Sequence, residues 1–313
     1  MTGWTIEDMP PLTDRTVVVT GANSGLGLEG SKAFARRGAT VLMACRSVER
    51  GESAAAEIRE AVPNATLDVR ECDLADLSNV ASFADGLRED YDAVDVLCNN
   101  AGVMAIPRSE TADGFETQFG VNHLGHFALT GHLLDLLGAV DGEARIVTQS
   151  SGAHEMGEID LEDLQRERSY GKWSAYGQSK LANLLFAYEL QRRLGNHAWD
   201  DVLSIACHPG YADTDLQFRG PREMGSTLRT AAMGVANAVF AQSAEQGALP
   251  MLYAATAEDV IGGEYVGPGG LFDMRGAPEF QQSNEASRNE ETAERLWAVS
   301  TDLTGVEYDF ERT

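Results

Sequence analysis

A β-branched segment that runs directly into a glycine-rich turn constrains the fold of this chain more than any other feature. The segment Thr16–Thr20 reads Thr-Val-Val-Val-Thr, which is short and apolar enough for a buried parallel strand. It is followed at once by Gly21-Ala22-Asn23-Ser24-Gly25-Leu26-Gly27 and then by a helical segment that extends to Arg37. In this order, the glycines let the backbone approach a pyrophosphate at the N-terminus of a helix. The spacing is G-x-x-x-G-x-G, and its place after a buried strand favours phosphate binding over a simple tight turn.

Segments with strand and helix patterns alternate along the rest of the chain. The further expected strands are Thr40–Cys45, one ending at Cys72-Asp73-Leu74, Val94–Cys98, Arg145–Gln149, Val202–Cys207 and an edge strand at Gly263–Val266. The further expected helices are Val48–Ala61, Asn79–Arg88, a long helix over Gly114–Leu137, Ser174–Leu194, Ala244–Ala257 and an exposed amphipathic tail helix within 284–304. This alternation predicts an α/β fold of the Rossmann type, with one doubly wound parallel sheet flanked by helices. Without repeats or linkers, we expect a single dinucleotide-binding domain over residues 1–313, with its core at about 14–272.

Polar residues collect where the expected strands end. Asp73, Asn100 and Ser151 each follow a strand, and Asn100 continues into Ala101-Gly102. Any one of them could cap a helix or shape a turn. Ligands of such sheets bind at the carboxyl ends of the strands, so the shared location favours a binding site.

The residue after the second strand bears on the choice of dinucleotide. An Asp or Glu at this place holds a ribose 2′-hydroxyl, whereas an Arg accommodates a 2′-phosphate. The sequence here reads Ala44-Cys45-Arg46-Ser47, although Glu49 lies close by. We therefore expect NADP(H) in preference to NAD(H).

Tyr176 and Lys180 are four residues apart at the start of an expected helix, so both side chains lie on one face. A cation beside a phenol favours the phenolate and lowers its pKa from about 10, which suits an acid–base catalyst near neutral pH. The spacing alone is common in helices and gains meaning only from the surrounding site.

Taken together, these segments resemble the short-chain dehydrogenase/reductase superfamily over about residues 14–272. The matching motifs, in order, are Thr20–Gly27, Asp73-Leu74, Asn99-Asn100-Ala101-Gly102, Asn122, Ser150-Ser151, Tyr176 with Lys180, and Pro209-Gly210. The segments Val121–Phe127 and Gln178–Asn183 are similar to the branch that holds retinol dehydrogenases, WW-domain oxidoreductases and protochlorophyllide reductases. Unlike many retinol dehydrogenases, this sequence shows no hydrophobic anchor at its N-terminus.

The resemblance implies a role for each matching residue. Tyr176 would protonate a carbonyl oxygen, Lys180 would lower the pKa of Tyr176 and bind the nicotinamide ribose, and Ser151, rather than Ser150, would hold the carbonyl oxygen. Asn122 would anchor a water that links Lys180 to solvent. The expected contacts with the cofactor are Gly21, Asn23, Ser24, Gly25, Leu26, Gly27, Arg46, Asp73, Leu74, Asn100, Ala101, Gly102, Tyr176, Lys180, Pro209, Gly210 and Thr214. Many NADP-using relatives carry a basic residue where this chain has Ser24, so Arg46 would provide most of the 2′-phosphate recognition.

The expected substrate is a small or medium, mostly apolar carbonyl compound or alcohol. The polar connector 152–173 and the segment 211–240 hold aromatic and methionine side chains that could cover it. A non-catalytic dinucleotide sensor is the main alternative, and the intact Tyr–Lys pair argues against it. An epimerase or dehydratase of the extended branch would have a G-x-x-G-x-x-G turn, whereas this chain has G-x-x-x-G-x-G, so this alternative is disfavoured. For a metal site, His123, His126 and His132 provide neither an H-E-x-x-H motif nor a Cys–His cluster, so we expect no metal.

The net charge of −25, from 49 acidic and 24 basic residues, disfavours nucleic acid and anionic membranes as partners. A solvated surface explains the charge, and adaptation to high salt is the sharper interpretation.

Residues 1–14 lack a signal-peptide pattern, and no apolar run is long enough for a membrane span. The four cysteines have no metal-ligand spacing and are expected to be buried thiols in a reducing cytoplasm. Relatives often form homo-oligomers through the Tyr–Lys helix and the long helix before Arg145, so the resemblance implies such a homo-oligomer as a candidate assembly.

Overall fold

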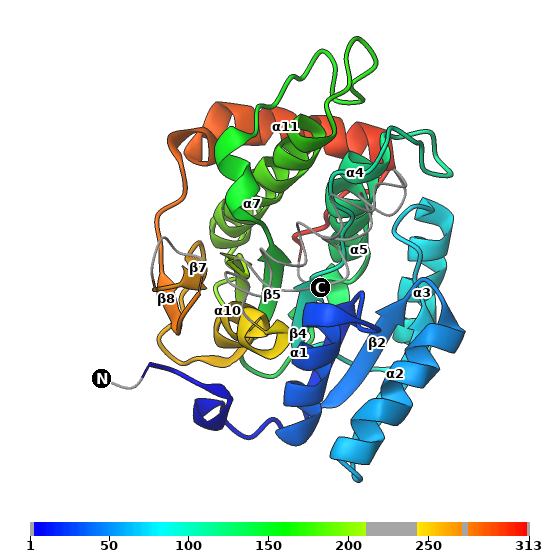
Figure 1. Ribbon diagram of the computed structural model, residues 1–313, viewed down its shortest axis with the longest axis vertical. Coiled ribbons are helices and arrows are strands. Elements are labelled where there is room, and N and C mark those ends of the chain that lie inside the picture. The colour runs from blue at the N-terminus through cyan, green and yellow to red at the C-terminus, as the bar shows by residue number, and fades with distance from the viewer. Residues whose placement is uncertain (1–2, 211–242, 271–274, 312–313) are drawn as a thin grey trace, which may run out of the picture.

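One mixed but mainly parallel sheet organises the computed structural model, which describes residues 3–210, 243–270 and 275–311 (Figure 1). Its strands are β1 (Thr16–Thr20), β2 (Thr40–Cys45), β3 (Thr66–Glu71), β4 (Val96–Asn99), β5 (Ala144–Gln149), β6 (Val202–Cys207), β7 (Tyr265–Pro268) and β8 (Pro278–Phe280). They lie in the order β3-β2-β1-β4-β5-β6-β7-β8, and all neighbours are parallel except β7 and β8. The chain thus starts in the middle of the sheet, builds outward to β3, and then crosses back beyond β1. This reversal leaves a crevice at the carboxyl ends of β1 and β4, where ligands of such sheets bind. The predicted Rossmann-type fold is confirmed.

Two strand predictions were wrong in detail. β7 is not at the edge, because the antiparallel strand β8 pairs with it from Val266 to Pro268. β3 ends at Glu71 rather than at Leu74, because Asp73 turns the chain away from the sheet. The Asp73 amide donates to Asn79 Oδ1 (2.7 Å), and Asp73 Oδ1 accepts from the amide of Ala75 (3.0 Å).

Helices cover both faces of the sheet. They are η1 (Ile6–Asp8), α1 (Gly25–Arg36), α2 (Val48–Ala61), α3 (Leu77–Asp90), α4 (Thr117–Phe119), η2 (Gly120–Leu124), α5 (Gly125–His132), α6 (Leu134–Gly138), η3 (Gly152–Met156), α7 (Lys172–Asn196), α10 (Ala244–Thr256), η5 (Glu285–Arg288) and α11 (Glu290–Thr304). Helices α1, α2 and α10 share a buried cluster on one face, and α3, α5, α6 and α7 share another on the opposite face. Successive residues of β1 alternate between the two layers, with Val17 and Val19 in the first and Val18 in the second, as the pleat of a strand requires.

The helix predicted over Gly114–Leu137 is broken into several pieces. It begins only at Thr117, passes through a single π-helical turn at Gly120–Leu124, and changes axis again at Leu133. Gly125 shows why the chain is constrained here, because a Cβ at this residue would lie 2.5 Å from the carbonyl oxygen of Leu74. The helix therefore packs directly on the backbone that follows β3, and the extra residue of the π turn re-aims the side chains around Asn122.

The C-terminal segment was predicted as an exposed amphipathic helix, and its exposure was wrong. Helix α11 lies next to α7 (Figure 1), and it buries Ala293, Leu296 and Trp297 on one side. The Trp297 ring packs against Phe127 and Tyr308, with centroids 5.1 and 4.6 Å apart. The amphipathic pattern was right, but its apolar face completes the core outside α5 and α7.

The predicted burial of the cysteines is confirmed, since Cys45, Cys72, Cys98 and Cys207 are all buried free thiols. Burial raises the pKa of Cys45 to about 11 and that of Cys72 to about 12. These thiols therefore stay protonated at neutral pH and pack as small apolar groups.

Candidate active site

The turn between β1 and α1 has the backbone geometry that its glycines predict. Gly21 and Gly25 have φ values of +67° and +54°, in the left-handed region that favours glycine. A Cβ on Gly27 would lie 2.4 Å from the carbonyl oxygen of Gly21, so a side chain at this residue would push the turn apart. Ser24 occupies the N-cap of α1 without a side-chain hydrogen bond to the helix. The first amides of α1 thus keep their donors for a ligand, as phosphate binding at a helix N-terminus requires.

This turn forms one wall of a cleft of about 380 Å³. The ends of β2, β3 and β4 form its other walls. The lining residues are Gly21, Asn23, Ser24, Gly25, Leu26, Gly27, Ala44, Arg46, Ser47, Arg50, Cys72, Asp73, Leu74, Ala75, Asn100, Ala101, Gly102, Val103, Thr117 and Val121. The structure therefore brings together all predicted cofactor contacts from the glycine turn to Gly102.

Thr20, the last residue of β1, fixes the loop after β4 to the glycine turn. Its Oγ1 accepts from the amides of Asn100 and Ala101, at 2.9 Å each. The Asn100 side chain donates to the carbonyl oxygen of Thr20 (2.8 Å). A Cβ on Gly21 would contact Ala101 at 3.1 Å, so the two walls meet here backbone to backbone.

Two arginines line the end of the cleft at β2. Arg46 follows the strand, as predicted, and Arg50 lies in the first turn of α2. Both are exposed, and Glu49 between them is also exposed. Two guanidinium groups at one end of a cleft offer a paired site for an anion.

The two serines after β5 have different surroundings. Ser150 is buried, and its Oγ donates to the carbonyl oxygen of Lys180 (2.8 Å), which fixes β5 to α7. Ser151 is only partly buried, and its Oγ accepts from the amide of Ala153 (3.2 Å). Burial raises the pKa of Tyr176 to about 12, and a hydrogen bond with Ser151 acts in the opposite direction. Ser151 is thus the serine that reaches the phenol.

Lys180 is buried, with 4% of its surface exposed, one turn after Tyr176 on α7. Its Nζ donates to the carbonyl oxygen of Gln149 (3.0 Å) and lies 5.9 Å from the centroid of the Tyr176 ring. Burial lowers the pKa of Lys180 to about 8. Burial dominates the pKa of both groups, and the ammonium donates to a carbonyl oxygen, so the lowering of the Tyr176 pKa by Lys180 stays a prediction.

Asn122 lies in the π turn and joins the loop after β4 to α7. Its Nδ2 donates to the carbonyl oxygen of Val103 and to Ser179 Oγ, both at 2.9 Å, and its Oδ1 accepts from the amide of Val103 (2.8 Å). A Cβ on Gly102 would lie 3.0 Å from Asn122 Oδ1 and 3.6 Å from Lys180 Nζ. Gly102 is therefore the point where the cleft meets the catalytic candidates.

The loop after β6 holds the remaining predicted contacts. Gly210 has a φ of +66°, and its amide donates to His208 Nδ1 (3.2 Å) just after Pro209. Thr214 and the whole predicted cover 211–240 lie outside the described residues.

The histidines near the site have structural partners. His126 bonds Thr20 Oγ1 through Nε2 (2.9 Å) and the carbonyl oxygen of Asn122 through Nδ1 (3.0 Å), and His123 bonds Ser300 Oγ (2.9 Å). Burial lowers the pKa of His126 to about 4 and that of His123 to about 3, so both rings are neutral. Among the described residues, no group of three potential metal-ligating side chains comes together.

Sequence reasoning missed several residues around the site. Arg50 lines the cleft four residues after Arg46, a spacing that could have pointed to it. Asn183 follows Lys180 on α7 by about one turn, and its Nδ2 donates to the same Gln149 oxygen as Lys180 (3.0 Å). His154 contacts the backbone of Ser151, and no sequence pattern signals this contact.

In the part of the chain that the structure describes, no helix combines the length and the apolar character needed to cross a bilayer. The N-terminal residues that are described form the short turn η1 and the lead-in to β1.

Comparison with known proteins agrees with this geometry. The family model for short chain dehydrogenases matches residues 15–223. The chain is 42% identical to human retinol dehydrogenase 13 over 310 residues, which is 98% of this chain and 89% of that relative. Among solved structures, an uncharacterized protein from Mycobacterium paratuberculosis is 44% identical, with a TM-score of 0.80 over 98% of this chain and 100% of that one. A short-chain dehydrogenase from Escherichia coli CFT073, solved with NADPH, is 26% identical, with a TM-score of 0.55 over 67% of this chain and 82% of that one. The chain therefore belongs to the short-chain dehydrogenase family, in its retinol dehydrogenase-like branch.

Proposed function

We propose that the protein is an NADP(H)-dependent oxidoreductase that interconverts a mostly apolar carbonyl compound and its alcohol. The observation that carries this proposal is the meeting at Gly102, where the cleft behind the glycine turn reaches Lys180 and Asn122. A dinucleotide laid along the cleft would end beside Tyr176 and Ser151. The uncapped first turn of α1 and the collision that a Cβ would cause at Gly27 both fit a pyrophosphate at this place.

The catalytic roles follow from the surroundings of each side chain. A bound NADPH would supply the hydride. Tyr176 has a pKa of about 12, so its phenol is protonated at neutral pH and can give its proton to a carbonyl oxygen. Ser151 would donate a hydrogen bond to that oxygen as negative charge develops on it. Lys180, with a pKa of about 8, is mostly charged at neutral pH and would stabilise the phenolate that remains.

Asn122 would support the return of the proton to Tyr176. Its Nδ2 donates to Val103 and Ser179 and its Oδ1 accepts from Val103, so these bonds hold the π turn in place beside Lys180. We propose that this turn positions a water that connects Lys180 with solvent.

The preference for NADP(H) over NAD(H) rests on the arginine pair. Arg46 and Arg50 line the end of the cleft where the adenosine ribose of a dinucleotide would lie after β2. Two guanidinium groups can bind a 2′-phosphate together. They would replace the basic residue that many NADP-using relatives carry where this chain has Ser24. The NADPH-bound relative from Escherichia coli supports the same choice of cofactor.

An apolar substrate is supported by exposed hydrophobic side chains near Tyr176. Trp173 is 48% exposed, and its ring lies 6.3 Å from that of Tyr176 in an edge-to-face arrangement. Met156, at the end of the turn that Ser151 begins, is 63% exposed. The name of the human relative, a retinol dehydrogenase, points to an apolar alcohol as well.

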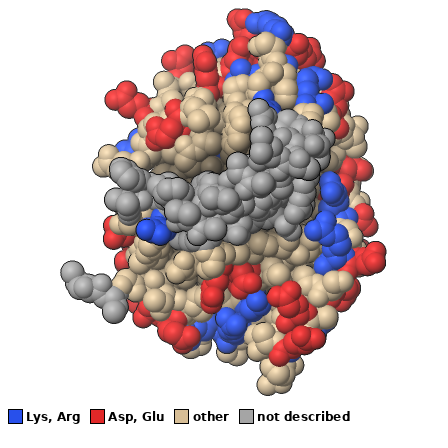
Figure 2. Space-filling view, in the orientation of Figure 1, with Lys and Arg blue, Asp and Glu red and all other residues tan. Residues whose placement is uncertain are grey.

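The charge supports a proposal about the setting of the enzyme. Figure 2 shows Asp and Glu spread over the visible face, with Lys and Arg among them. With a net charge of −25, we propose a cytoplasmic enzyme of a high-salt cell that does not bind nucleic acid. Raising the KCl concentration should then raise the midpoint of thermal unfolding, and an unchanged midpoint would contradict the high-salt setting.

For assembly, we propose that residues 1–313 act as one domain and that any homo-oligomer uses a surface other than the outer side of α7. Helix α11 already covers that side through Leu296 and Trp297. Light scattering of the full chain gives the mass of the assembly in solution. Crosslinking between engineered cysteines on α7 of two copies would contradict this proposal.

A panel of carbonyl compounds tests the function directly. Short and long aliphatic aldehydes, benzaldehyde and retinal would be reduced with NADPH and with NADH. We expect the highest kcat/KM with NADPH and the more apolar aldehydes, and loss of turnover in Tyr176→Phe with NADPH binding retained. Binding of NADPH without turnover of any member of the panel would favour the alternative, a non-catalytic dinucleotide sensor.

A further inference from the structure

His154 is a buried histidine beside the catalytic candidates that the proposed mechanism does not use. It lies in η3, three residues after Ser151, and only 3% of its surface is exposed. Its ring packs edge-to-face against Tyr265, with centroids 5.7 Å apart. The ring is thus held in one orientation by packing.

His154 makes two contacts with the same backbone oxygen of Ser151. Its amide donates to this oxygen at 3.0 Å, and its Nδ1 lies 2.8 Å from it. Because a carbonyl oxygen only accepts, Nδ1 must carry a proton. Both lone pairs of the Ser151 carbonyl oxygen are therefore used by one residue, which fixes the peptide plane that follows Ser151.

This peptide plane bears on the serine hydroxyl. Ser151 has an extended backbone, with φ −162° and ψ 154°, and its Oγ accepts from the amide of Ala153 (3.2 Å). The next two peptide groups thus set both the direction of its Cα–Cβ bond and its side-chain rotamer. A shift of the His154 ring would move the hydroxyl relative to Tyr176.

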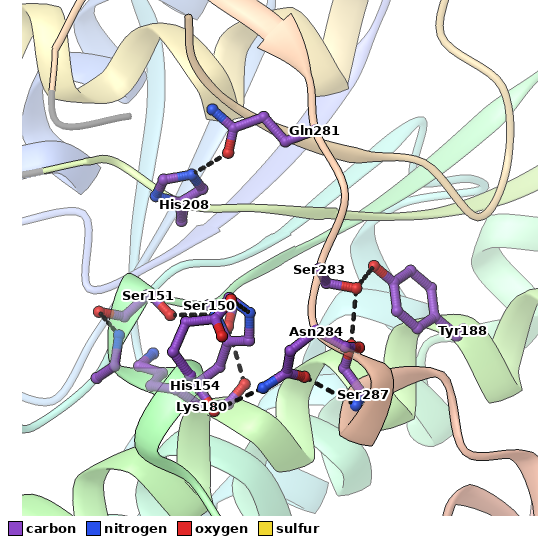
Figure 3. A network of polar contacts seen from close by, with 12 residues as sticks. Ser150, Ser151, His154, Lys180, Tyr188, His208, Gln281, Ser283, Asn284 and Ser287 are labelled. Atoms are coloured by element: carbon purple, nitrogen blue, oxygen red, sulfur yellow. Dashed lines mark hydrogen bonds and ion pairs between the residues drawn. The ribbon is translucent and has the colours of Figure 1, made fainter. Parts of the chain in front are cut away.

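A C-terminal segment holds His154 from the other side. Asn284 Nδ2 donates to the carbonyl oxygen of His154 (3.3 Å), and Asn284 Oδ1 accepts from the amide of Ser287 (3.0 Å). Ser283 joins the same segment to Tyr188 of α7, with the two hydroxyl oxygens 2.8 Å apart. Figure 3 shows this series of contacts from Tyr188 through Ser283, Ser287 and Asn284 to His154 and Ser151.

The far end of the turn packs on the backbone next to Tyr176. A Cβ on Gly157 would lie 2.4 Å from the carbonyl oxygen of Gly177, and a Cβ on Gly177 would lie 2.9 Å from that of Ala153. The turn that carries Ser151 and the helix that carries Tyr176 are therefore in direct backbone contact. His154 lies in the same turn, between Ala153 and Gly157, the two residues that make this contact.

We propose that His154 is a positioning residue, whose Nδ1–H holds the Ser151 carbonyl so that the serine hydroxyl stays aligned with Tyr176. This inference rests on the function proposed above, since it assigns the support of the same site. It also gives the segment 283–287 a role, because Asn284 holds the backbone of His154 in place.

Three variants test the proposal by steady-state kinetics with NADPH and the most reactive aldehyde of the panel. His154→Ala removes the Nδ1 donor, His154→Asn keeps a donor at nearly the same place, and Glu155→Gln is the matched control. Glu155 is mostly exposed, and its carboxylate lies 3.1 Å from His154 Nε2, so the control removes only the charge on the other side of the ring. We expect kcat to fall about 10- to 100-fold in His154→Ala, since small misplacements of catalytic groups have effects of this size.

The expected pattern is specific to positioning. His154→Asn should recover most of kcat, Glu155→Gln should match the unchanged enzyme, and the NADPH Kd from fluorescence titration should stay the same in all three. Asn284→Ala should lower kcat by a smaller factor and serves as the second route where His154→Ala folds poorly. The proposal is overturned when kcat is unchanged in both His154→Ala and Asn284→Ala, when His154→Asn is as slow as His154→Ala, or when Glu155→Gln is equally slow. Absence of turnover in the unchanged enzyme would instead refute the proposed function.

Discussion

The two ends of the cleft are built by different means. The end that would hold the phosphates consists mostly of backbone, with glycines at Gly21, Gly25 and Gly27 and an uncapped helix N-terminus. The end with Tyr176 and Lys180 consists of buried side chains, each fixed by packing or hydrogen bonds. The phosphate end depends on space that stays free because glycine has no side chain. The catalytic end depends on charged and proton-bearing side chains that are buried away from water.

This difference predicts how each end responds to substitution. Adding atoms to the phosphate end should block binding and leave chemistry intact. Removing a polar atom from the catalytic end should slow the chemistry and leave cofactor binding intact. The variants below test this division.

Among the variants that keep Tyr176 and Lys180, Ser151→Ala should have the largest effect. Loss of one hydrogen bond to the developing negative charge should lower kcat about 100- to 1,000-fold. Ser150→Ala is the control, because Ser150 donates to the carbonyl oxygen of Lys180 and should affect stability more than kcat. Steady-state kinetics and thermal unfolding of both variants separate the two roles. Equal losses of kcat would show that the serines do not divide the work in this way.

Gly27→Ala should affect the other end. The new Cβ would lie 2.4 Å from the carbonyl oxygen of Gly21, and relieving such crowding costs about 1 to 3 kcal/mol. Cofactor binding should weaken about 10- to 100-fold, while kcat at saturating NADPH should change little. Gly86→Ala in α3 is the control, since its Cβ would meet only Arg70 at 3.5 Å. A fall in kcat at saturation would break the division between the two ends.

Arg46→Asp should reduce the preference for NADPH over NADH. Loss of a charged hydrogen-bond donor, worth about 1.5 to 3 kcal/mol, should change the ratio of kcat/KM values by about tenfold or more. Arg50→Ala should change the ratio in the same direction by less, because Arg46 remains. An unchanged ratio in Arg46→Asp would refute the assignment of this end of the cleft to a 2′-phosphate.

The sequence predicted the backbone end better than the catalytic end. The strand, turn and helix from Thr16 onward have local signals, and β1, β2 and β6 have the predicted bounds. The π turn around Asn122 has no such signal, because one extra residue in a helix hardly changes its apolar pattern. β8 is only three residues long, too short for a period to be visible.

Long-range contacts explain what else could not be predicted. Asn284 and His154 are 130 residues apart, and neither residue type indicates the other. The pattern of Tyr176 and Lys180 correctly suggested that both lie on one face of a helix. It could not show that the ammonium is directed at Gln149 or that burial raises the pKa of the phenol.

The smallest effect, and the sharpest test of the contrast between the two ends, is expected for the stability of Lys180→Met. Burial lowers the pKa of Lys180 from 10.5 to about 8, so the charged form destabilises the folded state by roughly 3 kcal/mol, at about 1.4 kcal/mol per pKa unit. This destabilisation is full below pH 8 and is relieved as the pH rises towards 10.5, because the folded protein then releases the proton before the unfolded chain does. Methionine removes the charge and loses one hydrogen bond of about 1 kcal/mol, while Asn183 still donates to the Gln149 oxygen. We therefore expect Lys180→Met to be inactive but more stable by about 1 to 2 kcal/mol at pH 7 in urea unfolding, with the gain lost near pH 10. A variant that is less stable at pH 7 would mean that the buried ammonium stabilises the fold, and that the catalytic end is not maintained at the expense of stability.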